Sequence, residues 1–399
     1  MARRPGTPRL LRELNDRAAL ELLIGEGPLT RAQIGERTGL SKVTASQLLA
    51  RLEERGLVEV VGEQAGGRGP NAAVYGVVPS SAYVAGLEVG PHGVTAGVAD
   101  ITGRIVTQIT VGFAADDDPV QMVRAAVTKA CRSAKIAMPR LRTLVIGTPG
   151  LVDPRTGDVR FAFDLASWHE GVLAGLREQL HRPVIIENDV NLVAVAEHAH
   201  GAARGTDDFA LLWIDRGIGL AIMIDGRLHR GVSGGAGEIG YLPVPGVPLP
   251  GSVTASRVHG TPALAGGFGA LVGTDSLTEL AYAHGHTGPL HEAVRAASDE
   301  ASRTPAHVSP FLDALAARLA LGVAAVTTVL DPGLIVLSGS LGTAGGHPLA
   351  HRLERAVARL CPTHPRLLPG TLTETPVLHG ALHTALTRAR EEVFSTTTD

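Results

Sequence analysis

The chain of 399 residues has only two cysteines, no long apolar run and no apolar segment behind its basic N-terminus. Cys131 and Cys361 lie far apart and give no metal-ligand spacing, so we interpret both as reduced thiols of a cytoplasmic protein. The longest strongly apolar run without charge, residues 319–330, has 12 residues, too few to cross a bilayer. Because no apolar stretch follows "MARRPGTPRL", we expect no secretory signal and no membrane partner.

The composition is typical of a soluble globular protein, with 44% hydrophobic and 19% charged residues. The length predicts two or three domains. Residues 1–79 carry 11 basic and 9 acidic side chains, whereas the remainder carries 25 and 30. Any nucleic acid is therefore expected to bind at the N-terminal end.

The first eighty residues are predicted to form three helices and a β-hairpin. "NDRAALELLIGEG" suits a helix with Asp16 as its cap, and "LTRAQIGERTG" carries the capping-box pair Thr30 and Gln33. "LSKVTASQLLARLEERG" suits a third helix that begins after Ser41. One stripe of that helix is apolar: Ala45, Leu48, Leu49 and Leu52. The opposite face holds Val43, Gln47, Ala50 and Arg51.

Two short helices joined by "TGLS" are typical of a helix-turn-helix, and "LVEVVGEQAGGRGPNAAVYGV" suits a wing with Arg68 at its tip. The alternative is a small helical bundle that docks a protein. The segment resembles the winged helix-turn-helix of bacterial regulators, which predicts a DNA-binding domain over residues 1–79. We expect Arg68 to reach a minor groove. The residues expected to face the duplex are Lys42, Thr44, Ser46, Gln47 and Arg51.

Beyond residue 80, strand-like runs alternate with helical segments, which predicts α/β architecture. The helical segments are expected at 118–136, 170–181, 190–200, 311–330 and 377–393. Polar clusters follow several of the strands, at the ends where α/β sheets bind ligands. One of them, "IIENDVNL" (185–192), places Glu187, Asn188 and Asp189 between a strand and a helix.

Four segments in this order, "IGTPGLVD", "IIENDVNL", "GIGLAIMIDGRLHRGVSGGAGEIGY" and "LDPGLIVLSGSLG", resemble the ROK family of repressors, open reading frames and sugar kinases. The resemblance covers roughly residues 81–392. It implies the two-lobed, actin-like ATPase fold of sugar kinases, placed here behind a winged helix-turn-helix as in the transcriptional regulators of the family. We expect one lobe from residues 81–189 and 380–399, and the other from 190–379.

In kinases of this family, the residue that matches Asp189 is the general base for a sugar hydroxyl. The resemblance implies a sugar site made of Gly147, Pro149, Gly150, Asp164, Asn188, Asp189 and Glu238. Asp164 precedes Trp168 in "FDLASWHEG", which resembles an Asn-Leu-x-x-Trp stretch of the family. Two interpretations of the Asn188–Asp189 pair stay open. The pair could grip a polyol, or it could only cap the helix that follows.

Both phosphate loops depart from the family pattern. "EVGPH" stands where Asp-x-Gly-Gly-Thr/Ser is expected, so that Glu88 replaces the aspartate and a proline removes a backbone N–H donor. "DRGIG" places Arg216 where a small hydroxyl residue is usual. Phosphoryl transfer needs a held and neutralised γ-phosphate. We therefore predict that the chain is not an enzyme and that no residue is catalytic.

The zinc site of the family is also expected to be absent. Tyr241 stands where a histidine is usual after the "GE" glutamate, and no cysteine occurs between residues 131 and 361. The nearby histidines lack thiolate partners and metal spacing: His259, His284, His286 and His291. No metal ligand and no cofactor is predicted.

The sequence thus predicts a cytoplasmic, DNA-binding transcriptional regulator, most simply a repressor, that senses a sugar or sugar derivative without phosphorylating it. Its expected partners are a palindromic double-stranded operator and further copies of itself, as a homodimer or homotetramer. Two alternatives stay open. One is an ATP-dependent sugar kinase with a DNA-binding extension. The other is an effector-free regulator whose second part only oligomerises or docks a protein.

Overall fold

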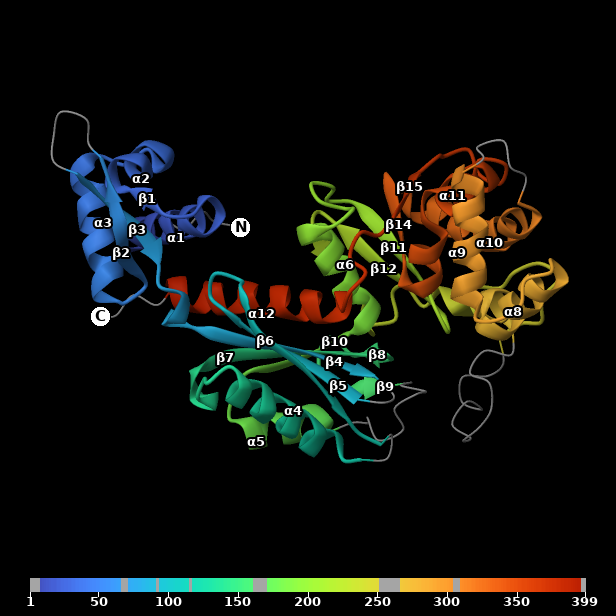
Figure 1. The fold of residues 1–399 in the computed structure, drawn as a ribbon, viewed down its shortest axis with the longest axis horizontal. Helices are drawn as coiled ribbons and strands as arrows, with labels where there is room; N and C mark the ends of the chain where they lie inside the picture. Colours follow the sequence, from blue (N-terminus) through green and yellow to red (C-terminus); the bar gives the residue numbers. More distant parts are fainter. Residues whose placement is uncertain are drawn as a thin grey trace.

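The computed structural model describes residues 8–65, 71–90, 93–114, 117–160, 171–250, 266–303 and 309–395. The chain begins with a winged helix domain (Figure 1). Its elements are α1 (Pro8–Glu26), β1 (Leu29–Thr30), α2 (Arg31–Thr38), α3 (Lys42–Glu54), β2 (Val58–Gln64) and β3 (Ala72–Val77). Strands β1, β3 and β2 form one antiparallel sheet in that order.

Local sequence signals fix the helix ends of this domain. Thr30 caps α2 in a full capping box with Gln33, and Gly39 ends that helix in the left-handed conformation. The Ser41 side chain accepts a hydrogen bond from the Thr44 backbone N–H and caps α3. The predicted apolar stripe of α3 is buried, at Ala45, Leu48, Leu49 and Leu52. These predictions are confirmed.

The prediction that Asp16 caps the first helix is wrong. α1 begins at Pro8, so Asp16 lies in its middle, and the side chain is buried. Its Oδ1 atom accepts a hydrogen bond from Arg51 Nη2 at 2.6 Å, and its Oδ2 atom lies 3.8 Å from Arg55 Nη1. A buried carboxylate is stable only when it is paired. Two arginines at the end of α3 supply that charge, which the local helix signals did not reveal.

The remainder of the chain folds into two lobes with the same sheet topology. The first sheet has the order β10-β7-β4-β5-β6, and the second has the order β13-β12-β11-β14-β15. In each sheet, three consecutive strands pair antiparallel and two later strands add in parallel. The chain thus repeats one α/β unit, which confirms the predicted two-lobed architecture.

The first lobe begins after the short turn η1 (Pro79–Ser81). It contains β4 (Tyr83–Gly90), β5 (Gly93–Asp100), β6 (Ile105–Gly112), α4 (Pro119–Ser133), η2 (Met138–Arg140), β7 (Leu141–Thr148), β8 (Leu151–Val152), β9 (Val159–Arg160), α5 (Val172–Leu180) and β10 (Val184–Asn188). One face of the sheet packs on α4 and α5, through a core that includes Leu87, Ile146 and Leu176. The other face carries the last helix of the chain.

The second lobe follows α6 (Asp189–His200). It contains β11 (Phe209–Ile214), β12 (Ile218–Ile224), β13 (Arg227–Leu228), η3 (Ile239–Tyr241), α7 (Gly267–Val272), α8 (Thr274–Ala283), α9 (Leu290–Arg303), α10 (Pro310–Leu330), β14 (Leu334–Ser338), α11 (Gly339–Val357) and β15 (Arg366–Pro369). α10 is long and apolar enough to span a membrane by length and composition, but 11 of its residues are buried in the core of this lobe. A core helix passes the same test, so α10 is weak evidence for a membrane span.

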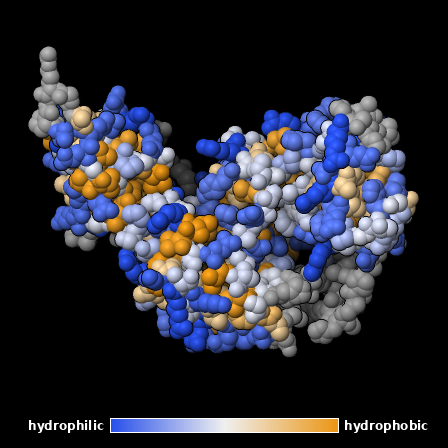
Figure 2. Space-filling model, viewed as in Figure 1, coloured by the Kyte–Doolittle hydropathy of each residue, from blue (hydrophilic) through white to orange (hydrophobic). Residues whose placement is uncertain are grey.

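The last helix, α12 (Pro376–Ser395), lies between the junction of the lobes and the winged helix domain. It packs on β4, β7 and β5 of the first sheet, on α6, and on α1 of the winged helix domain. Figure 1 shows α12 in red, running from the junction of the lobes to the winged helix domain. Figure 2 shows the surface hollowed between that domain and the second lobe, on one side of α12. The winged helix domain is therefore held mainly by the first lobe and α12.

Candidate functional site

The outer face of α3 presents small and polar side chains. Lys42 and Gln47 are exposed, and Thr44 and Ser46 are partly exposed. The Thr44 hydroxyl lies 2.9 Å from the Ser41 hydroxyl, and Ser46 Oγ accepts a hydrogen bond from Arg31 Nη1 at 2.9 Å. Val43 lies on this face too and is 67% exposed, so base edges in a major groove would meet one apolar side chain among the small and polar ones. Four of the predicted residues are thus together on one accessible helix face.

Arg51 and Arg68 differ from these four. Arg51 was expected to face the duplex, but its guanidinium turns toward α1 and pairs with the buried Asp16 at 2.6 Å. Its partner is inside the domain, so the contact holds α3 against α1, and we do not retain Arg51 as a DNA contact. Arg68, at the expected tip of the wing, lies outside the described residues.

The second candidate site lies where strands β7 and β10 end and α6 begins. Asn188 caps α6, because its Oδ1 atom accepts a hydrogen bond from the Asn191 backbone N–H at 3.1 Å. Its Nδ2 atom donates to the Gly150 carbonyl at 3.0 Å. The same amide therefore caps the helix and holds the turn after β7. The capping interpretation describes what Asn188 does within the chain.

Gly147, predicted as part of the ligand site, has a packing role in the structure. It is buried in β7, and a Cβ atom there would lie 2.4 Å from Val377 Cγ1 and 2.8 Å from Leu192 Cδ1. The absence of a side chain lets α12 and α6 pack directly on the strand. Pro149 and Gly150 follow it in a partly exposed turn. Asp164 lies outside the described residues, as does Trp168.

Glu187 of "IIENDVNL" is buried and joins the two lobes. Its Oε1 atom accepts hydrogen bonds from Asn191 Nδ2 at 2.9 Å and from the Asn188 backbone N–H at 3.0 Å. Its Oε2 atom accepts from Arg230 Nε of the second lobe at 2.6 Å. Three donors satisfy this carboxylate, so Glu187 is a structural anchor of the site rather than a ligand group.

The glycine-rich loop after β13 makes a second contact between the lobes. Gly234 has φ +84°, and a Cβ atom there would lie 2.0 Å from the Val152 carbonyl oxygen of β8. Only glycine permits this backbone to lie so close to its neighbour in a left-handed conformation. The loop that carries Glu238 is in this way fixed against the first lobe.

Two carboxylates of this junction, Glu88 at the end of β4 and Glu238 before η3, are within reach of the charge of a third, Asp189 at the start of α6. Burial raises the pKa of Glu88, and the charge of Asp189 raises it further. The pKa of Glu238 is raised by the same two causes. Glu238 in turn raises the pKa of Tyr241, after the effect of burial. Mutually repelling acceptors in a partly buried place favour a ligand that brings hydrogen-bond donors.

Asp189 and Glu88 differ in the hydrogen-bond donors that the protein supplies to their carboxylate oxygens. Asp189 Oδ1 accepts a hydrogen bond from the Val190 backbone N–H at 2.8 Å. Glu88 Oε2 is buried and has no hydrogen-bond partner among the described residues. A hydroxyl group of a polyol is a donor of the right kind for such an oxygen.

Sequence reasoning did not identify Glu88 or Arg230 as residues of this site. Glu88 was noted only as a change in a phosphate loop, and nothing in the spacing relates it to Glu238, which comes from the other lobe. Arg230 lies 43 residues after its partner Glu187. A buried acidic residue that ends a strand was the available signal, since it requires a positive partner somewhere.

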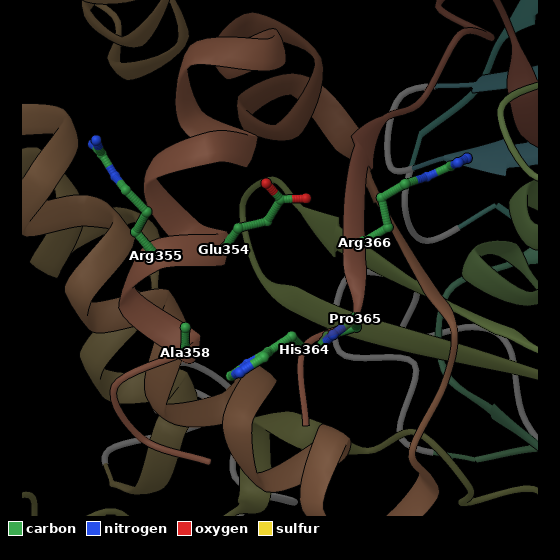
Figure 3. Close-up of a pocket in the computed structure, with 6 residues that line it drawn as sticks. All are labelled: Glu354, Arg355, Ala358, His364, Pro365 and Arg366. Atoms are coloured by element: carbon green, nitrogen blue, oxygen red, sulfur yellow. The ribbon is translucent and has the colours of Figure 1, made fainter. Parts of the chain in front are cut away.

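No group of three or more His, Cys, Asp and Glu side chains that could hold a metal ion occurs in the part of the chain that the structure describes. A shallow cavity of about 390 Å³ lies elsewhere, between the end of α11 and β15 (Figure 3). Its carboxylate, Glu354, already accepts a hydrogen bond from the Leu367 backbone N–H at 2.8 Å. None of Glu88, Asp189 and Glu238 lines this cavity.

Comparisons with known families and proteins agree with this architecture. The model of the ROK family matches residues 84–387, and that of the MarR family matches residues 13–69. The DNA-binding transcriptional dual regulator NagC of Escherichia coli K12 is 28% identical over 243 residues, which are 60% of this chain and 59% of NagC. The xylose repressor of Bacillus subtilis is 28% identical over 248 residues, 59% of this chain and 61% of the repressor. The match thus spans about three fifths of these relatives.

Solved structures give the same picture over more of the chain. A ROK hexokinase from Thermus thermophilus has a TM-score of 0.61 and 27% identity, and the alignment covers 77% of this chain and 99% of the hexokinase. A ROK family transcriptional regulator, described as a homologue of the Escherichia coli MLC protein, has a TM-score of 0.71 and covers 96% of this chain and 98% of its own. Its identity is 17%, so it shows the fold alone, winged helix domain included.

Proposed function

The chain belongs to the ROK family, and we propose that it is a sugar-responsive, DNA-binding transcriptional repressor. The observation that carries the proposal is the winged helix domain, whose α3 presents an accessible polar face ahead of a two-lobed sugar-kinase-like module. Regulators among its relatives bear names of the same kind, NagC and the xylose repressor. A kinase needs no such domain.

DNA binding is assigned to α3 and the wing. Lys42 suits a phosphate contact, and Gln47 suits a base edge, because an amide can bond bidentately to adenine. Thr44 and Ser46 lie beside them. A homodimer or homotetramer would present two such helices and prefer an inverted repeat, with half-sites roughly 10 bp or a multiple of that apart.

The effector is assigned to the carboxylates of the lobe junction. Asp189, Glu238 and Glu88 form a set of acceptors, and Asn188 with Pro149 and Gly150 shapes the adjoining turn. A sugar or sugar derivative fits, since it offers several hydroxyl donors on one small frame. Two relatives are named an N-acetylglucosamine repressor and a xylose repressor, which makes these sugars the first candidates to test.

ATP turnover is not part of the proposed function. In the second phosphate loop, Asp215 is held within the protein: its Oδ1 accepts from the Arg216 backbone N–H at 2.9 Å, and its Oδ2 lies 3.4 Å from the Ser340 N–H. The Arg216 carbonyl accepts from the Thr274 hydroxyl at 2.9 Å. Of these groups, the Arg216 backbone N–H is a donor that a phosphate could use, and it is already bonded to Asp215. We further propose that the protein works in the cytoplasm without zinc or another cofactor.

The test selects operators and assays turnover with the same preparation. Wild-type protein should enrich an inverted repeat from random duplex DNA, and one sugar of a panel containing N-acetylglucosamine and xylose should weaken its binding. ADP release with the same sugars should stay at background. Sugar-dependent ADP release would instead support the kinase alternative. Operator binding that no sugar changes would support the effector-free regulator.

A further inference from the structure

α12 is one continuous helix that reaches from the lobe junction to the winged helix domain. At 1.5 Å per residue, its 20 residues span about 30 Å. Its first turn lies at the lobe junction, and its last turn lies against the winged helix domain (Figure 1). A rigid element with an end in each site can carry a movement from one to the other.

At the first end, α12 packs on the strand that carries a carboxylate of the proposed effector site. Glu88 of β4 pairs in the sheet with Gly147, over which Val377 of the first turn of α12 packs. The backbone of the next residue, Leu378, lowers the pKa of Glu88 against the raising effects of burial and Asp189. Glu88 Oε2 is buried without a partner among the described residues. This side chain therefore lies beside the N-terminal turn of α12, where an effector hydroxyl could also bond to it.

The N-terminal end of α12 is tightly packed against α6 and β7. A Cβ atom on Gly380 would lie 1.9 Å from the Leu192 carbonyl oxygen of α6, so the two helix backbones touch there. The side chain of Val377 fills the space over Gly147 of β7. Because α6 begins with Asp189, a shift of Asp189 or Glu88 must also move the start of α12.

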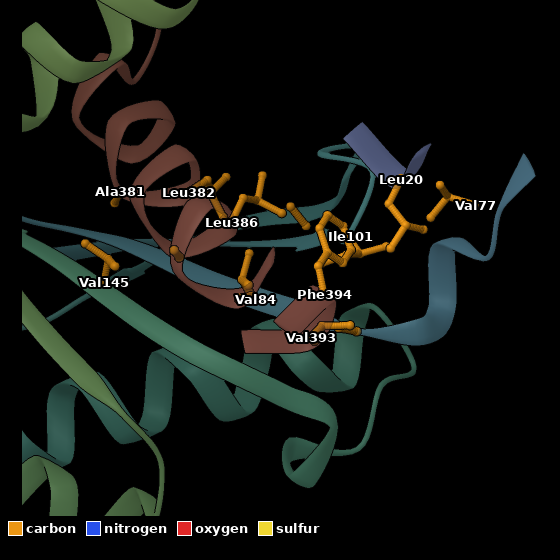
Figure 4. Packing of buried hydrophobic residues seen from close by; sticks show 14 of the residues in the cluster. Leu20, Val77, Val84, Ile101, Val145, Ala381, Leu382, Leu386, Val393 and Phe394 are labelled. Atoms are coloured by element: carbon orange, nitrogen blue, oxygen red, sulfur yellow. The ribbon is translucent and has the colours of Figure 1, made fainter. Parts of the chain in front are cut away.

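At the other end, α12 contacts the end of α3 directly. The Val393 carbonyl accepts a hydrogen bond from Arg55 Nη2 at 2.7 Å, and Arg55 is the residue that ends α3. Val393 and Phe394 belong to the same buried cluster as Leu20 of α1 and Val77 of β3 (Figure 4). The core is therefore continuous from the first lobe into the DNA-binding domain, and Arg55 connects α12 to the helix that carries Lys42 and Gln47.

We propose that α12 transmits the effector response, with Glu88 as its input and the Val393–Arg55 hydrogen bond as its output. This inference rests on the proposed function, because it names how that effector site controls DNA binding. An effector hydroxyl that bonds to Glu88 changes how this carboxylate meets the first turn of α12. The start of α12 then shifts, and the shift reaches α3 through Arg55. Arg55 acts as a positioning residue and not as a DNA contact.

A double-mutant cycle tests the relay without knowledge of the effector. Operator affinity is measured by titration with the DNA selected by wild type, for wild type, Glu88→Gln, Arg55→Met and the double variant. Glu88→Gln replaces the carboxylate beside the first turn of α12 with an amide, and it should weaken binding about three- to tenfold. In the Arg55→Met background the relay is broken, so Glu88→Gln should alter operator affinity less than about 1.5-fold. Without a relay, sites this far apart act additively, and Glu88→Gln would have the same effect in both backgrounds.

Arg388→Met is the matched control, because Arg388 is exposed on α12 and pairs only with Glu391 of the same helix among the described residues. In that background the effect of Glu88→Gln should be undiminished. Equal effects of Glu88→Gln in the wild-type and Arg55→Met backgrounds would overturn the relay, and so would no effect of Glu88→Gln at all. Wild-type protein that selects no DNA would instead overturn the proposed function itself, and the relay with it. Thermal melting of each variant identifies any loss caused by unfolding.

Discussion

Arg230 of the second lobe and Glu187 of the first lobe form an ion pair in which Nε lies 2.6 Å from Oε2. The Glu187 side chain is 7% exposed, whereas that of Arg230 is 40% exposed. Glu187 directly precedes Asn188, the cap of α6, and so lies beside the groups proposed to bind the effector. It therefore joins the lobes at the point where a ligand would act.

Loss of this ion pair should destabilise the protein. Arg230→Ala leaves a buried carboxylate with one donor fewer, which we expect to cost about 1–2 kcal/mol of unfolding free energy, discounted for the exposure of Arg230. Urea denaturation measures it, and Arg227→Ala, an exposed arginine of the neighbouring strand, is the control. Equal midpoints for the two variants would mean that the contact does not stabilise the lobe junction.

Asp189→Asn should show whether Asp189 acts in effector binding or as the general base of a kinase. The amide keeps the shape but loses the charge, and hydrogen bonds to charged acceptors contribute roughly 1.5–3 kcal/mol each. We expect operator affinity without sugar to be unchanged and effector affinity to fall by about one to two decades. Operator titrations with the active sugar measure both. Loss of ADP release in the variant, from a wild type that turns over ATP, would contradict the sensor assignment.

Gln47→Ala and Lys42→Ala should weaken operator binding in different ways. Removing a base contact is expected to cost about 1–3 kcal/mol and to relax sequence preference at one position. Removing a phosphate contact should weaken binding to all sequences. It should also reduce the magnitude of the slope of log affinity against log salt concentration by about one. Gel shifts at several salt concentrations distinguish the two. Lys129→Ala, on α4 far from α3, serves as the control for a lost lysine. Unchanged affinity and preference in both variants would remove α3 from the interface.

His383 of α12 should make stability depend on pH. Burial lowers its pKa to about 4, helped by His200, Arg390 and His198. The ring of His200 lies 5.3 Å away, edge-on. Because the folded pKa is below the unfolded value of about 6.5, the unfolded chain binds the proton first as the pH falls. This contribution is fully present above pH 6.5 and is lost progressively as the pH falls toward 4.

The loss should reach at most about 3.4 kcal/mol, for a difference of about 2.5 pKa units at 1.36 kcal/mol per unit. His383→Gln should flatten this part of the pH profile of the urea midpoint between pH 7.5 and 5. His347→Gln, a change of an exposed histidine on α11, should not. A profile of His383→Gln parallel to that of wild type would show that this histidine does not titrate as stated.

Untagged protein should contain no stoichiometric zinc. Tyr241 occupies the position where the family has a histidine, and the cysteine-bearing segment is absent from the sequence. Elemental analysis after exhaustive dialysis measures the metal content. One zinc per chain would show that another set of ligands has replaced the family site.

The sequence by itself determined the elements and several of their ends. The capping box of Thr30 and Gln33, the Ser41 cap and the buried stripe of α3 all depend on residues three or four positions apart. At that spacing, helix geometry alone decides which groups meet. The motifs around Asn188 and Glu238 likewise indicated the family and the place of the proposed effector site, because strand ends in an α/β sheet are adjacent in any such fold.

Only the tertiary structure decided which distant groups pair. Arg51 meets Asp16 across 35 residues, Arg230 meets Glu187 across 43, and Arg55 meets Val393 across 338. Each pair contains a buried or partly buried polar group whose partner is chosen by how helices and lobes pack, and no local pattern encodes that choice. For the same reason, Asp16 could be mistaken for a cap, and the packing role of Gly147 could not be predicted. The tight packing of α12 against both sites follows from side-chain volumes across the core, which become definite only when the chain is folded.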